Sequence, residues 1–296
     1  MSRGASSDVL AGQVVVITGA NTGLGATTAC ALARLGATTV LACRNAERAA
    51  TAADRVRNQS GSHQVEVVEL DLADLESVGR AAKDILERFD RLDVLMNNAG
   101  GLSTERRTTR QGFEQTFGVN HLGPFLLTNL LLDRLRQSAP SRIVNVSSIG
   151  HRFARGMRWN DLQMQQGYDA FAAYGQSKLA NVLFTRALAQ RLPSAEVTAN
   201  ACHPGSVRTH LGRDGDTTGL IGLMSFTVLR PFYVSPERGA RTQVYLASAP
   251  EMAGKSGGYY VRCREHQASR AARDDAAADR LWEVSDRLVS RAEPVS

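Results

Sequence analysis

The sequence predicts an α/β fold in one domain: a doubly wound sheet of about seven parallel strands with helices on both faces. Short, near-continuous apolar runs alternate with longer Ala- and Leu-rich stretches, as buried parallel strands and their crossover helices do. The chain has 296 residues, of which 43% are hydrophobic, enough for one large α/β core. A glycine-rich turn joins the first apolar run to the first helical stretch. Right-handed crossovers then give the doubly wound arrangement.

The elements follow one another along the whole chain, with no repeat or linker between them. The expected strands cover residues 13–18, 38–43, 64–70, 93–97, 142–147, 196–201 and 258–262. The expected helices cover residues 26–35, 45–58, 74–89, 111–137, 174–191, 236–248 and 274–290. Ser235 and Pro236 are typical of the N-cap and first position of a helix. Pro124 is expected to kink its helix, because it lacks an N–H and crowds the carbonyl of Asn120.

Composition argues against several function classes. The formal net charge is +6 without a dense basic block, so nucleic-acid binding is not expected. The four cysteines form no CxxC pair and the six histidines no i,i+4 pair, so no metal site and a reducing compartment are expected. The first ten residues lack an apolar signal region, and the run 219–229 is too short to span a bilayer. We expect a cytoplasmic monomer or homodimer that takes a small-molecule substrate and does not bind membranes.

The stretch TGANTGLG, residues 18–25, separates the first strand from the first helix. A helix N-terminus presents free N–H groups to an anion, and small residues let the backbone approach a pyrophosphate. The spacing G-x-x-x-G-x-G differs from the commoner G-x-G-x-x-G. A loop that merely needs flexible turns is the alternative. The strand–turn–helix context favours a dinucleotide site in a Rossmann-type domain.

The end of the second strand indicates which dinucleotide is bound. A NAD site usually has an acidic residue there, to hold the free ribose hydroxyl. This chain reads LACRN, with Arg44 and Asn45 in that place. A guanidinium suits a 2′-phosphate dianion. The residues therefore predict NADP(H) rather than NAD(H), with a solvated arginine at a strand end as the alternative.

Tyr174 and Lys178 lie four residues apart in an expected helix. Residues with this spacing share one helix face. An unperturbed phenol titrates near pH ~10, and a neighbouring ammonium favours the phenolate and lowers the pKa. The pair can therefore be a tuned acid/base, or it can be a coincidence of helical composition.

Five further segments stand in order: NNAG at 97–100, VNHLGPF at 119–125, IVNVSS at 143–148, YGQSK at 174–178 and HPGSVRT at 203–209. Together with the glycine turn they resemble the short-chain dehydrogenase/reductase superfamily over nearly the whole chain. The surrounding sequence is similar to the retinol-dehydrogenase-like branch, which includes carbonyl reductases.

The resemblance implies roles for individual side chains. Tyr174 would be the general acid, and Lys178 would lower its pKa and bind the nicotinamide ribose. Ser148 would polarise the carbonyl, with Ser147 the weaker candidate, and Asn120 would hold a water for proton resupply. The cofactor contacts implied are Gly19, Asn21, Thr22, Gly23, Leu24, Gly25, Arg44, Asn45, Asp71, Leu72, Asn98, Ala99, Gly100, Tyr174, Lys178, Pro204, Gly205, Val207 and Thr209. His203 and His210 are expected to be hydrogen-bonded or solvated, because the acid role already has a tyrosine.

Two variable stretches are expected to shape the substrate pocket. The insertion 149–173 could wall a pocket for a large apolar substrate or form a flap packed on its own small core. Its apolar residues are Phe153, Met157, Trp159, Met164, Tyr168 and Phe171. The second stretch, 206–234, suits a lid, with a membrane-surface or dimer patch as the alternative. The ends, 1–10 and 291–296, are expected to fray.

The sequence therefore predicts an NADPH-dependent carbonyl reductase acting on a ketone or aldehyde of a bulky apolar molecule. A polyketide or polycyclic ketone of secondary metabolism is the first candidate substrate, and a retinol/retinal-type alcohol dehydrogenase is the alternative. A non-catalytic NADP(H)-sensing regulator is a second alternative, although it need not keep all four of Asn120, Ser148, Tyr174 and Lys178. An epimerase or dehydratase fits less well, because such relatives usually space the glycines differently.

Overall fold

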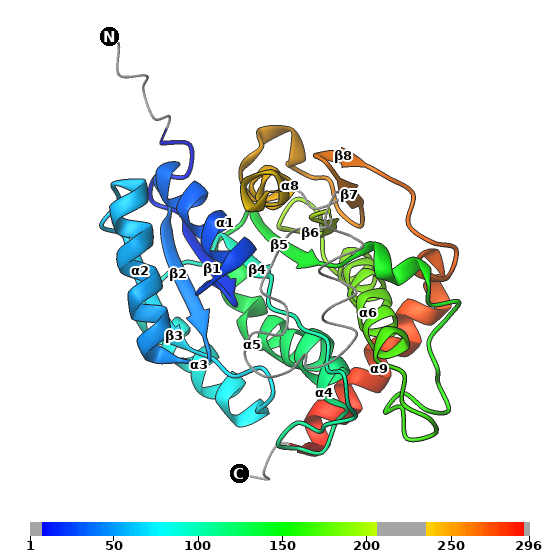
Figure 1. Ribbon diagram of the computed structural model, residues 1–296. Coiled ribbons are helices and arrows are strands. Elements are labelled where there is room, and N and C mark those ends of the chain that lie inside the picture. The colour runs from blue at the N-terminus through cyan, green and yellow to red at the C-terminus, as the bar shows by residue number, and fades with distance from the viewer. Residues whose placement is uncertain (1–7, 206–234, 293–296) are drawn as a thin grey trace.

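A single eight-stranded sheet forms the centre of the computed structural model, which describes residues 8–205 and 235–292 (Figure 1). Its strands are β1 (Val14–Thr18), β2 (Thr38–Cys43), β3 (Val65–Glu69), β4 (Val94–Asn97), β5 (Ser141–Val146), β6 (Val197–His203), β7 (Tyr259–Val261) and β8 (Arg264–Glu265). The order is β3-β2-β1-β4-β5-β6-β7-β8, parallel from β3 to β7, with β8 antiparallel to β7. The α/β fold with a mostly parallel sheet is confirmed. The two-residue β8 is the addition to the seven strands expected, and it is too short to give a sequence pattern.

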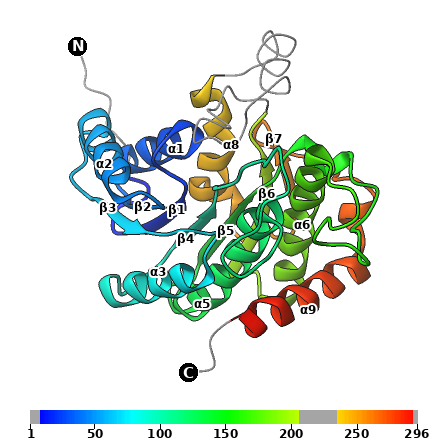
Figure 2. The same cartoon turned by 60° about the horizontal axis from the view of Figure 1, so that its bottom comes forward.

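Helices cover both faces of the sheet, as Figure 2 shows. They are α1 (Gly23–Arg34), α2 (Ala46–Ser60), α3 (Leu75–Arg88), α4 (Gln115–Phe117), α5 (Gly123–Gln137), α6 (Ala170–Arg191), α8 (Pro236–Ser248) and α9 (Asp275–Ala292). One hydrophobic core joins the sheet to α1, α2 and α8, and the other joins it to α3, α5, α6 and α9. Alternate residues of β1 serve the two cores: Val15 and Ile17 pack in the first, Val14 and Val16 in the second. This alternation explains why β1 is apolar throughout.

The strand order reverses beside β1, which pairs with β2 on one side and β4 on the other. Ligands of doubly wound sheets bind outside the carboxyl ends of the strands at such a switch point. The segments that follow β1, β2 and β4 carry the glycine turn, Arg44 and the NNAG motif. The topology therefore brings these three motifs to one edge of the sheet.

Local capping residues determine where several helices begin. The side chain of Asn45 accepts a hydrogen bond from the N–H of Arg48 (2.8 Å) at the start of α2. Ser235 accepts one from the N–H of Arg238 (3.4 Å) at the start of α8, as the sequence predicts. Asp169 accepts one from the N–H of Ala172 (2.7 Å), so α6 begins at Ala170, ahead of the expected start at residue 174. Each cap satisfies an N–H that the first helical turn leaves unpaired.

The helix expected over 111–137 is interrupted. It consists of α4, a π-helix at Gly118–Leu122, and α5, which has Pro124 in its first turn. Pro124 has no N–H to bond the carbonyl of Asn120, so the ordinary ladder cannot continue through this point. The wider π-turn takes up the mismatch. The expected disturbance at Asn120 is real, and it takes the form of a π-helix.

The insertion 149–173 contributes to both the interior and the surface. Met157 and Met164 are buried, and Met157 packs in the main core. Phe153 and Phe171 are 79% and 59% exposed. The insertion is therefore neither a separate flap with its own core nor a wholly apolar wall.

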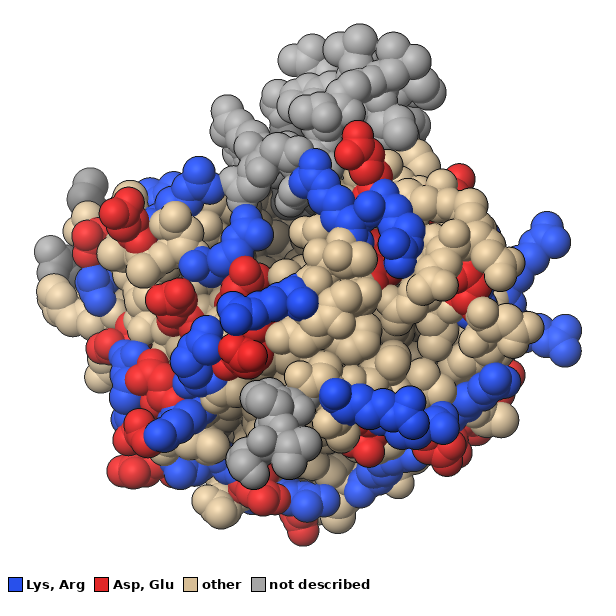
Figure 3. All heavy atoms as spheres, turned by 90° about the horizontal axis from the view of Figure 1, so that it is seen from below, with Lys and Arg blue, Asp and Glu red and all other residues tan. Residues whose placement is uncertain are grey.

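The ends of the described chain are better packed than expected. Leu10 is buried, and its N–H bonds the carbonyl of Leu35 (2.9 Å), while α9 continues to Ala292. Residues 1–7 and 293–296 lie outside the described residues, as does the expected lid 206–234. None of the described helices is long and apolar enough to cross a membrane. On the face seen in Figure 3, basic and acidic side chains are interspersed.

Candidate active site

The glycine turn between β1 and α1 has a backbone that other residues would not fit. Gly19 and Gly23 have φ of +64° and +53°, in the left-handed region. A Cβ on Gly25 would lie 2.5 Å from the carbonyl oxygen of Gly19 and 2.9 Å from Cα of Ala20. The side chain of Thr22 makes no capping hydrogen bond to α1, so the first-turn N–H groups are left without a side-chain partner. The turn is therefore suited to hold a pyrophosphate.

A cleft of about 620 Å³ begins at this turn. Of the cofactor contacts implied by the sequence, its walls include Gly19, Asn21, Arg44, Asn45, Asp71, Leu72, Ala99 and Gly100. Asn120 lines it too, together with residues that the sequence did not single out: Ala42, Cys43, Arg48, Leu70, Gly101, Leu102, Ser103, Gln115, Thr116 and Val119. The cleft thus runs from the glycine turn to the π-helix.

The remaining predicted contacts divide into two sets. Thr22, Gly23, Leu24 and Gly25 form the glycine turn and first turn of α1 beside the cleft, and Pro204 and Gly205 follow β6. Val207 and Thr209 lie outside the described residues, and so does His210.

Arg44, directly after β2, is exposed at the wall of the cleft. Its neighbour Asn45 has its side-chain oxygen occupied by the cap of α2. Arg48, one helical turn further, lines the same wall. The sequence analysis missed Arg48, although its place in the first turn of a helix that begins beside Arg44 was a usable signal. Two arginines therefore line the cleft after the end of β2.

Asn98 connects neighbouring elements through hydrogen bonds at the point where the strand order reverses. Its side-chain amide donates to the carbonyl of Thr18 (2.8 Å), and its own N–H donates to the hydroxyl of Thr18 (3.0 Å). Its side-chain oxygen accepts from Gln243 of α8 (3.1 Å). Asn98 thus joins β1, β4 and α8, and Ala99 and Gly100 line the cleft beyond it.

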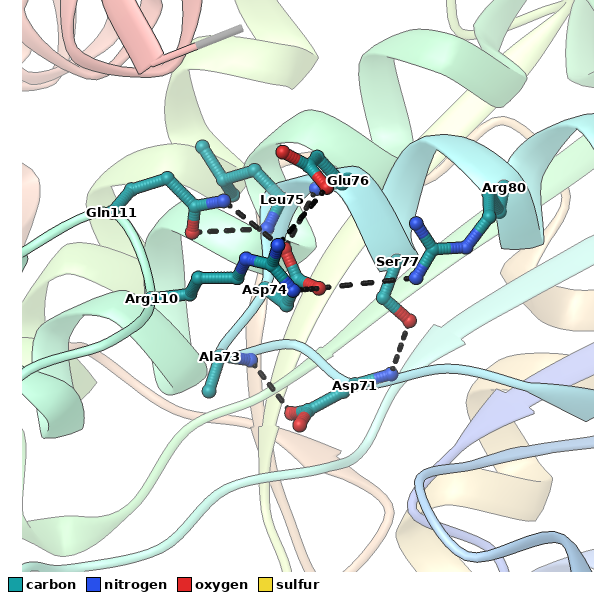
Figure 4. A network of polar contacts seen from close by, with 9 residues as sticks. All are labelled: Asp71, Ala73, Asp74, Leu75, Glu76, Ser77, Arg80, Arg110 and Gln111. Carbon is teal, nitrogen blue, oxygen red and sulfur yellow. Dashed lines mark hydrogen bonds and ion pairs between the residues drawn. The ribbon is translucent and has the colours of Figure 1, made fainter.

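The wall after β3 is held by a network of polar contacts (Figure 4). The carboxylate of Asp71 accepts from the N–H of Ala73 (2.9 Å). Asp74 caps α3 and accepts from the amide of Gln111 (3.0 Å), whose oxygen accepts from the N–H of Leu75 (3.2 Å). Through Gln111, the start of α3 is tied to the segment that leads into α4. Both sides of this part of the cleft are therefore fixed in place.

Asn120 occupies the middle of the π-helix and is fully buried. Its side-chain oxygen accepts from the N–H of Gly101 (2.8 Å), and its amide nitrogen donates to the carbonyl of Gly101 (2.9 Å). The same nitrogen donates to the hydroxyl of Ser177 (2.9 Å), which in turn donates to the carbonyl of Tyr174 (2.8 Å). Ser177, which the sequence analysis did not single out, links Asn120 to the helix that carries Tyr174 and Lys178.

Lys178 is only 4% exposed, and its ammonium donates to the carbonyl of Val146 at the end of β5 (3.1 Å). Its Nζ lies 5.6 Å from the ring centre of Tyr174. A Cβ on Gly100 would be 2.9 Å from Nζ of Lys178 and 3.2 Å from Oδ1 of Asn120. Lys178, Asn120 and the cleft therefore meet where Gly100 leaves room. Burial lowers the pKa of Lys178 to about 8.

Tyr174 and Ser148 are hydrogen-bonded through their side chains. Ser148 also accepts from the N–H of Gly150 (3.1 Å), and a Cβ on Gly150 would lie 3.2 Å from the ring of Tyr174. Tyr174 keeps some exposure as a residue, yet desolvation of the phenol raises its pKa, and the bond to Ser148 opposes this only in part. We expected Lys178 to lower the pKa of Tyr174, but desolvation has the larger effect and raises it. The reason is that the phenolate would lose its hydration in this site.

Two neighbouring polar residues turn away from the reacting groups. Ser147 is buried and donates its hydroxyl to the carbonyl of Lys178 (2.7 Å), so it supports α6. His203 is buried at the end of β6, and burial lowers its pKa to about 4. Nδ1 of His203 is buried without a hydrogen-bond partner among the described residues, so the expectation that this histidine is hydrogen-bonded or solvated is wrong for that nitrogen.

The described residues contain no group of three or more His, Cys, Asp or Glu placed to hold a metal ion. Cys43 lies in the cleft wall, and burial raises the pKa of its thiol to about 11. A thiol that stays protonated is a poor nucleophile. The chemistry of the cleft therefore belongs to its hydroxyl, ammonium and amide groups.

Comparisons with known proteins agree with this geometry. The model of the short chain dehydrogenase family matches residues 13–218. Human retinol dehydrogenase 14 is 44% identical over 302 residues, covering 98% of this chain and 90% of that protein. Human retinol dehydrogenase 13 is 46% identical over 295 residues, covering 98% and 88%.

Solved structures show the same fold. A crystal structure of a Mycobacterium paratuberculosis protein matches with a TM-score of 0.76 and 37% identity, covering 95% of this chain and 94% of that one. The complex of Pseudomonas aeruginosa RhlG with NADP matches with a TM-score of 0.68 and 26% identity, covering 86% and 96%. The family model spans more than half of the chain, and the relatives cover nearly all of it. This chain belongs to the short-chain dehydrogenase family and is an oxidoreductase that acts on alcohol or carbonyl groups.

Proposed function

We propose that this chain is an NADP(H)-dependent carbonyl reductase with Tyr174 as the proton donor. The observation that carries the proposal is the placement of two neighbouring pairs: Lys178 and Asn120 meet at Gly100, at the end of the cleft, and Tyr174 and Ser148 meet at Gly150. Buried amide and hydroxyl bonds from Asn120 through Ser177 hold the backbone of α6 at Tyr174. The hydroxyls of Tyr174 and Ser148 are then preorganised to donate to the charge that develops on a carbonyl oxygen.

The residues present fit a nicotinamide dinucleotide. The glycine turn leaves no space for a Cβ at Gly25 and presents helix N–H groups, which suits a pyrophosphate. Arg44 and Arg48 at the end of β2 suit a 2′-phosphate, which is the basis for proposing NADP(H) over NAD(H). The bound cofactor supplies the hydride.

The proton chemistry follows from the surroundings of Tyr174. Desolvation raises the pKa of its phenol, so at neutral pH the hydroxyl carries the proton that a reduced carbonyl oxygen needs. Ser148 keeps its oxygen on the N–H of Gly150 (3.1 Å), and its own proton, which is directed at the phenol of Tyr174, would be redirected to the substrate carbonyl. The buried ammonium of Lys178 lies close enough to stabilise the phenolate after transfer. This set of groups supplies the proton that reduction needs near pH 7, and the reverse oxidation depends on the cofactor ratio.

A bulky, apolar substrate is proposed from the surface next to the reacting groups. Ile149 follows Ser148 directly and is 43% exposed, and Phe153 lies just beyond. Phe171, one helical turn before Tyr174 on α6, is exposed as well. Exposed large apolar side chains close in sequence to Ser148 and Tyr174 are the basis for this proposal, because exposed apolar surface beside a site is typical of a binding surface. A polyketide or polycyclic ketone of secondary metabolism is the first substrate class, and the expected lid 206–234 lies outside the described residues.

A retinal-type aldehyde is the second candidate substrate. The observation that favours it is the 44% and 46% identity to human retinol dehydrogenases 14 and 13 over nearly the whole chain. The single domain over 1–296, the cytoplasmic location, the absence of membrane and nucleic-acid binding, and a monomeric or homodimeric state stay predictions.

The test follows NADPH consumption on a panel of polyketide ketones, retinal, steroid ketones and simple aldehydes. Tyr174→Phe is expected to lower kcat by about 10³-fold with unchanged NADPH affinity, the size typical of a lost general acid. Tyr245→Phe on α8 is the matched control and should keep wild-type kcat. Turnover that survives in Tyr174→Phe would remove the proposed proton donor. NADH used as well as NADPH would contradict the proposed cofactor.

A further inference from the structure

His151 is a buried histidine that has no role in the proposed reduction. It lies in the 3-10 turn Ile149–Arg152, directly after Ser148, and it has no exposed surface. The proposed mechanism assigns roles to Ser148 before the turn and to Tyr174, which packs against Gly150 of the turn. His151 is thus close to the reacting groups but points into the protein.

Both ring nitrogens of His151 have partners that determine its protonation state. Nδ1 lies 2.6 Å from the carbonyl oxygen of Ser148. Nε2 accepts from the N–H of Ser269, at 3.2 Å. A carbonyl can only accept and a backbone N–H can only donate, so the proton must be on Nδ1 and the lone pair on Nε2. The imidazole is neutral and held in one tautomer.

The bond from Nδ1 acts on the segment that carries the catalytic serine. The carbonyl of Ser148 accepts from Nδ1 and from the N–H of His151 (3.2 Å). Within the same turn, Oγ of Ser148 accepts from the N–H of Gly150. Gly150 packs closely on Tyr174, because a Cβ on Gly150 would lie 3.2 Å from the ring. A shift of the Ser148 carbonyl would therefore move the Ser148 hydroxyl relative to Tyr174.

The other side of the imidazole is held by the C-terminal part of the chain. The ring of Tyr259 in β7 packs on it with centroids 4.8 Å apart. Ser269 contributes the N–H that bonds Nε2, and Arg152 in the turn donates to the carbonyl of Gln267 (2.5 Å). The segment after β8 therefore sets where the imidazole lies.

We infer that His151 is a positioning residue: its neutral Nδ1–H tautomer, held by Ser269 and Tyr259, fixes Ser148 for polarising the substrate carbonyl. The inference rests on the proposed carbonyl reduction. Residues 259–269, far along the chain from Ser148, thereby take part in arranging the reacting groups.

The tautomer should be stable over the working pH range. Burial lowers the pKa of His151, the bond to Ser148 opposes the shift, and the positive charge of Arg152 adds to it. His203 in β6 and Tyr259 in β7 are the other titratable groups that face this ring. A second proton would have to go on Nε2, where the N–H of Ser269 already points. Protonation would therefore break the link to Ser269.

Three substitutions of His151 separate positioning from packing. His151→Asn places an amide donor near the position of Nδ1, His151→Gln reaches instead toward Nε2, and His151→Leu has neither function. We expect Leu and Gln to lower kcat by about 10- to 100-fold, as misplaced supporting groups do. Asn should recover most of the loss. The NADPH Kd should stay within about twofold in all three variants, because the cleft does not include this turn. His63→Leu, at an exposed histidine, is the control.

Wild-type kcat in His151→Leu, or equal losses in Asn and Gln, would overturn the inference. Because the Leu variant can fail to fold, the tautomer is also read in the intact protein by two-bond ¹H–¹⁵N NMR, with the signal assigned through His151→Asn. A neutral Nδ1–H imidazole at pH 7 is expected, and an Nε2–H or charged ring would overturn the inference. A wild-type protein that reduces no carbonyl would instead refute the proposed function, and the NMR result would be unaffected.

Discussion

The two ends of the candidate site differ in which part of the chain forms them, backbone at one end and side chains at the other. The cofactor end, between β1, β2 and β3, is formed by backbone: a turn with glycines in left-handed conformations and a position where no Cβ fits. The catalytic end, between β4, β5 and α6, is formed by buried side chains that bond backbone carbonyls and one another. Gly100 lies where the two ends meet, in contact with Lys178 and Asn120.

This difference indicates how each end can fail. A backbone-built cradle is insensitive to most neighbouring side chains but cannot accept an added methyl group. A buried polar network is sensitive to the loss of any one partner, because the group left behind is unpaired and desolvated. Substitutions of glycine, arginine and histidine residues can test this difference between the two ends.

The largest effect is expected at the junction of the two ends. Gly100→Ala would place a Cβ 2.9 Å from Nζ of Lys178 and 3.2 Å from Oδ1 of Asn120, so these groups must move, and a misplacement of about 1 Å in a catalytic group lowers kcat by roughly 10²-fold. Gly156→Ala is the matched control, because nothing lies within 4 Å of its Cβ position and it is not part of the cleft. Steady-state kinetics with NADPH distinguish the two. Equal kcat values would mean that the Gly100 contact does not constrain Lys178.

At the cofactor end, Gly25→Ala would force a Cβ to within 2.5 Å of the carbonyl oxygen of Gly19. Overpacking of about 2 kcal/mol would raise the NADPH Kd by roughly 30-fold. Gly79→Ala in α3, with nothing within 4 Å of its Cβ position, is the control for an added methyl group in a helix. Titration of NADPH fluorescence measures both. An unchanged Kd in Gly25→Ala would show that the turn can relax.

A smaller and more selective effect is expected for Arg44→Ala. Losing one charge-assisted contact to the 2′-phosphate should weaken NADPH binding by about tenfold, while NADH, which lacks this phosphate, should bind unchanged. The two cofactors in the same variant provide the internal control. Equal weakening of both would assign Arg44 a structural role at the end of β2.

The smallest effect concerns His121, next to Asn120 in the π-helix. It is buried among Phe117, Phe125 and Phe184, its Nε2 bonds the hydroxyl of Ser285 in α9 (2.8 Å), and burial lowers its pKa to about 3. The unfolded chain takes up this proton near pH ~6.5, so stability is full above that pH and falls as the pH drops toward about 3.

Protonation of His121 in the unfolded chain should by itself lower the free energy of unfolding by about 1 kcal/mol between pH 7 and 5.5. Urea unfolding at the two pH values measures the change. The double variant His121→Phe/Ser285→Ala removes both partners of this hydrogen bond, so its free energy of unfolding should fall less between the two pH values. A part of the fall should remain, because the pKa values of His151 and His203 are also lowered by burial. A drop as large as in the wild type would mean that His121 does not control it.

Much of the fold could be predicted from local patterns. The strands at Val14–Thr18 and Thr38–Cys43 lie within one residue of their predicted ends, because continuous apolar runs are hard to place anywhere but a buried sheet. The helix expected over 111–137, with a kink at Pro124, begins only at Gln115 and is interrupted by a π-helix. Its periodicity is helical on both sides of Asn120, and the missing donor of Pro124 gives no indication of whether a kink or a π-turn results.

The motifs placed Tyr174, Lys178, Ser148 and Asn120 at one site because their order and spacing follow a family pattern. Ser177 and His151 could not be found in this way. Their roles depend on partners in other elements: Asn120 for Ser177, and Ser269 for His151.

The sequence by itself determined the sheet, the glycine turn, the arginine that follows β2 and the residues that we propose for catalysis, since each is recognised from neighbours along the chain. Only the tertiary structure decided how those groups behave. Burial raises the pKa of Tyr174 although Lys178 is its neighbour, and the absence of a side chain at Gly100 lets Lys178 approach Asn120. Desolvation and close approach are properties of packing between elements, and no spacing along a single segment encodes them.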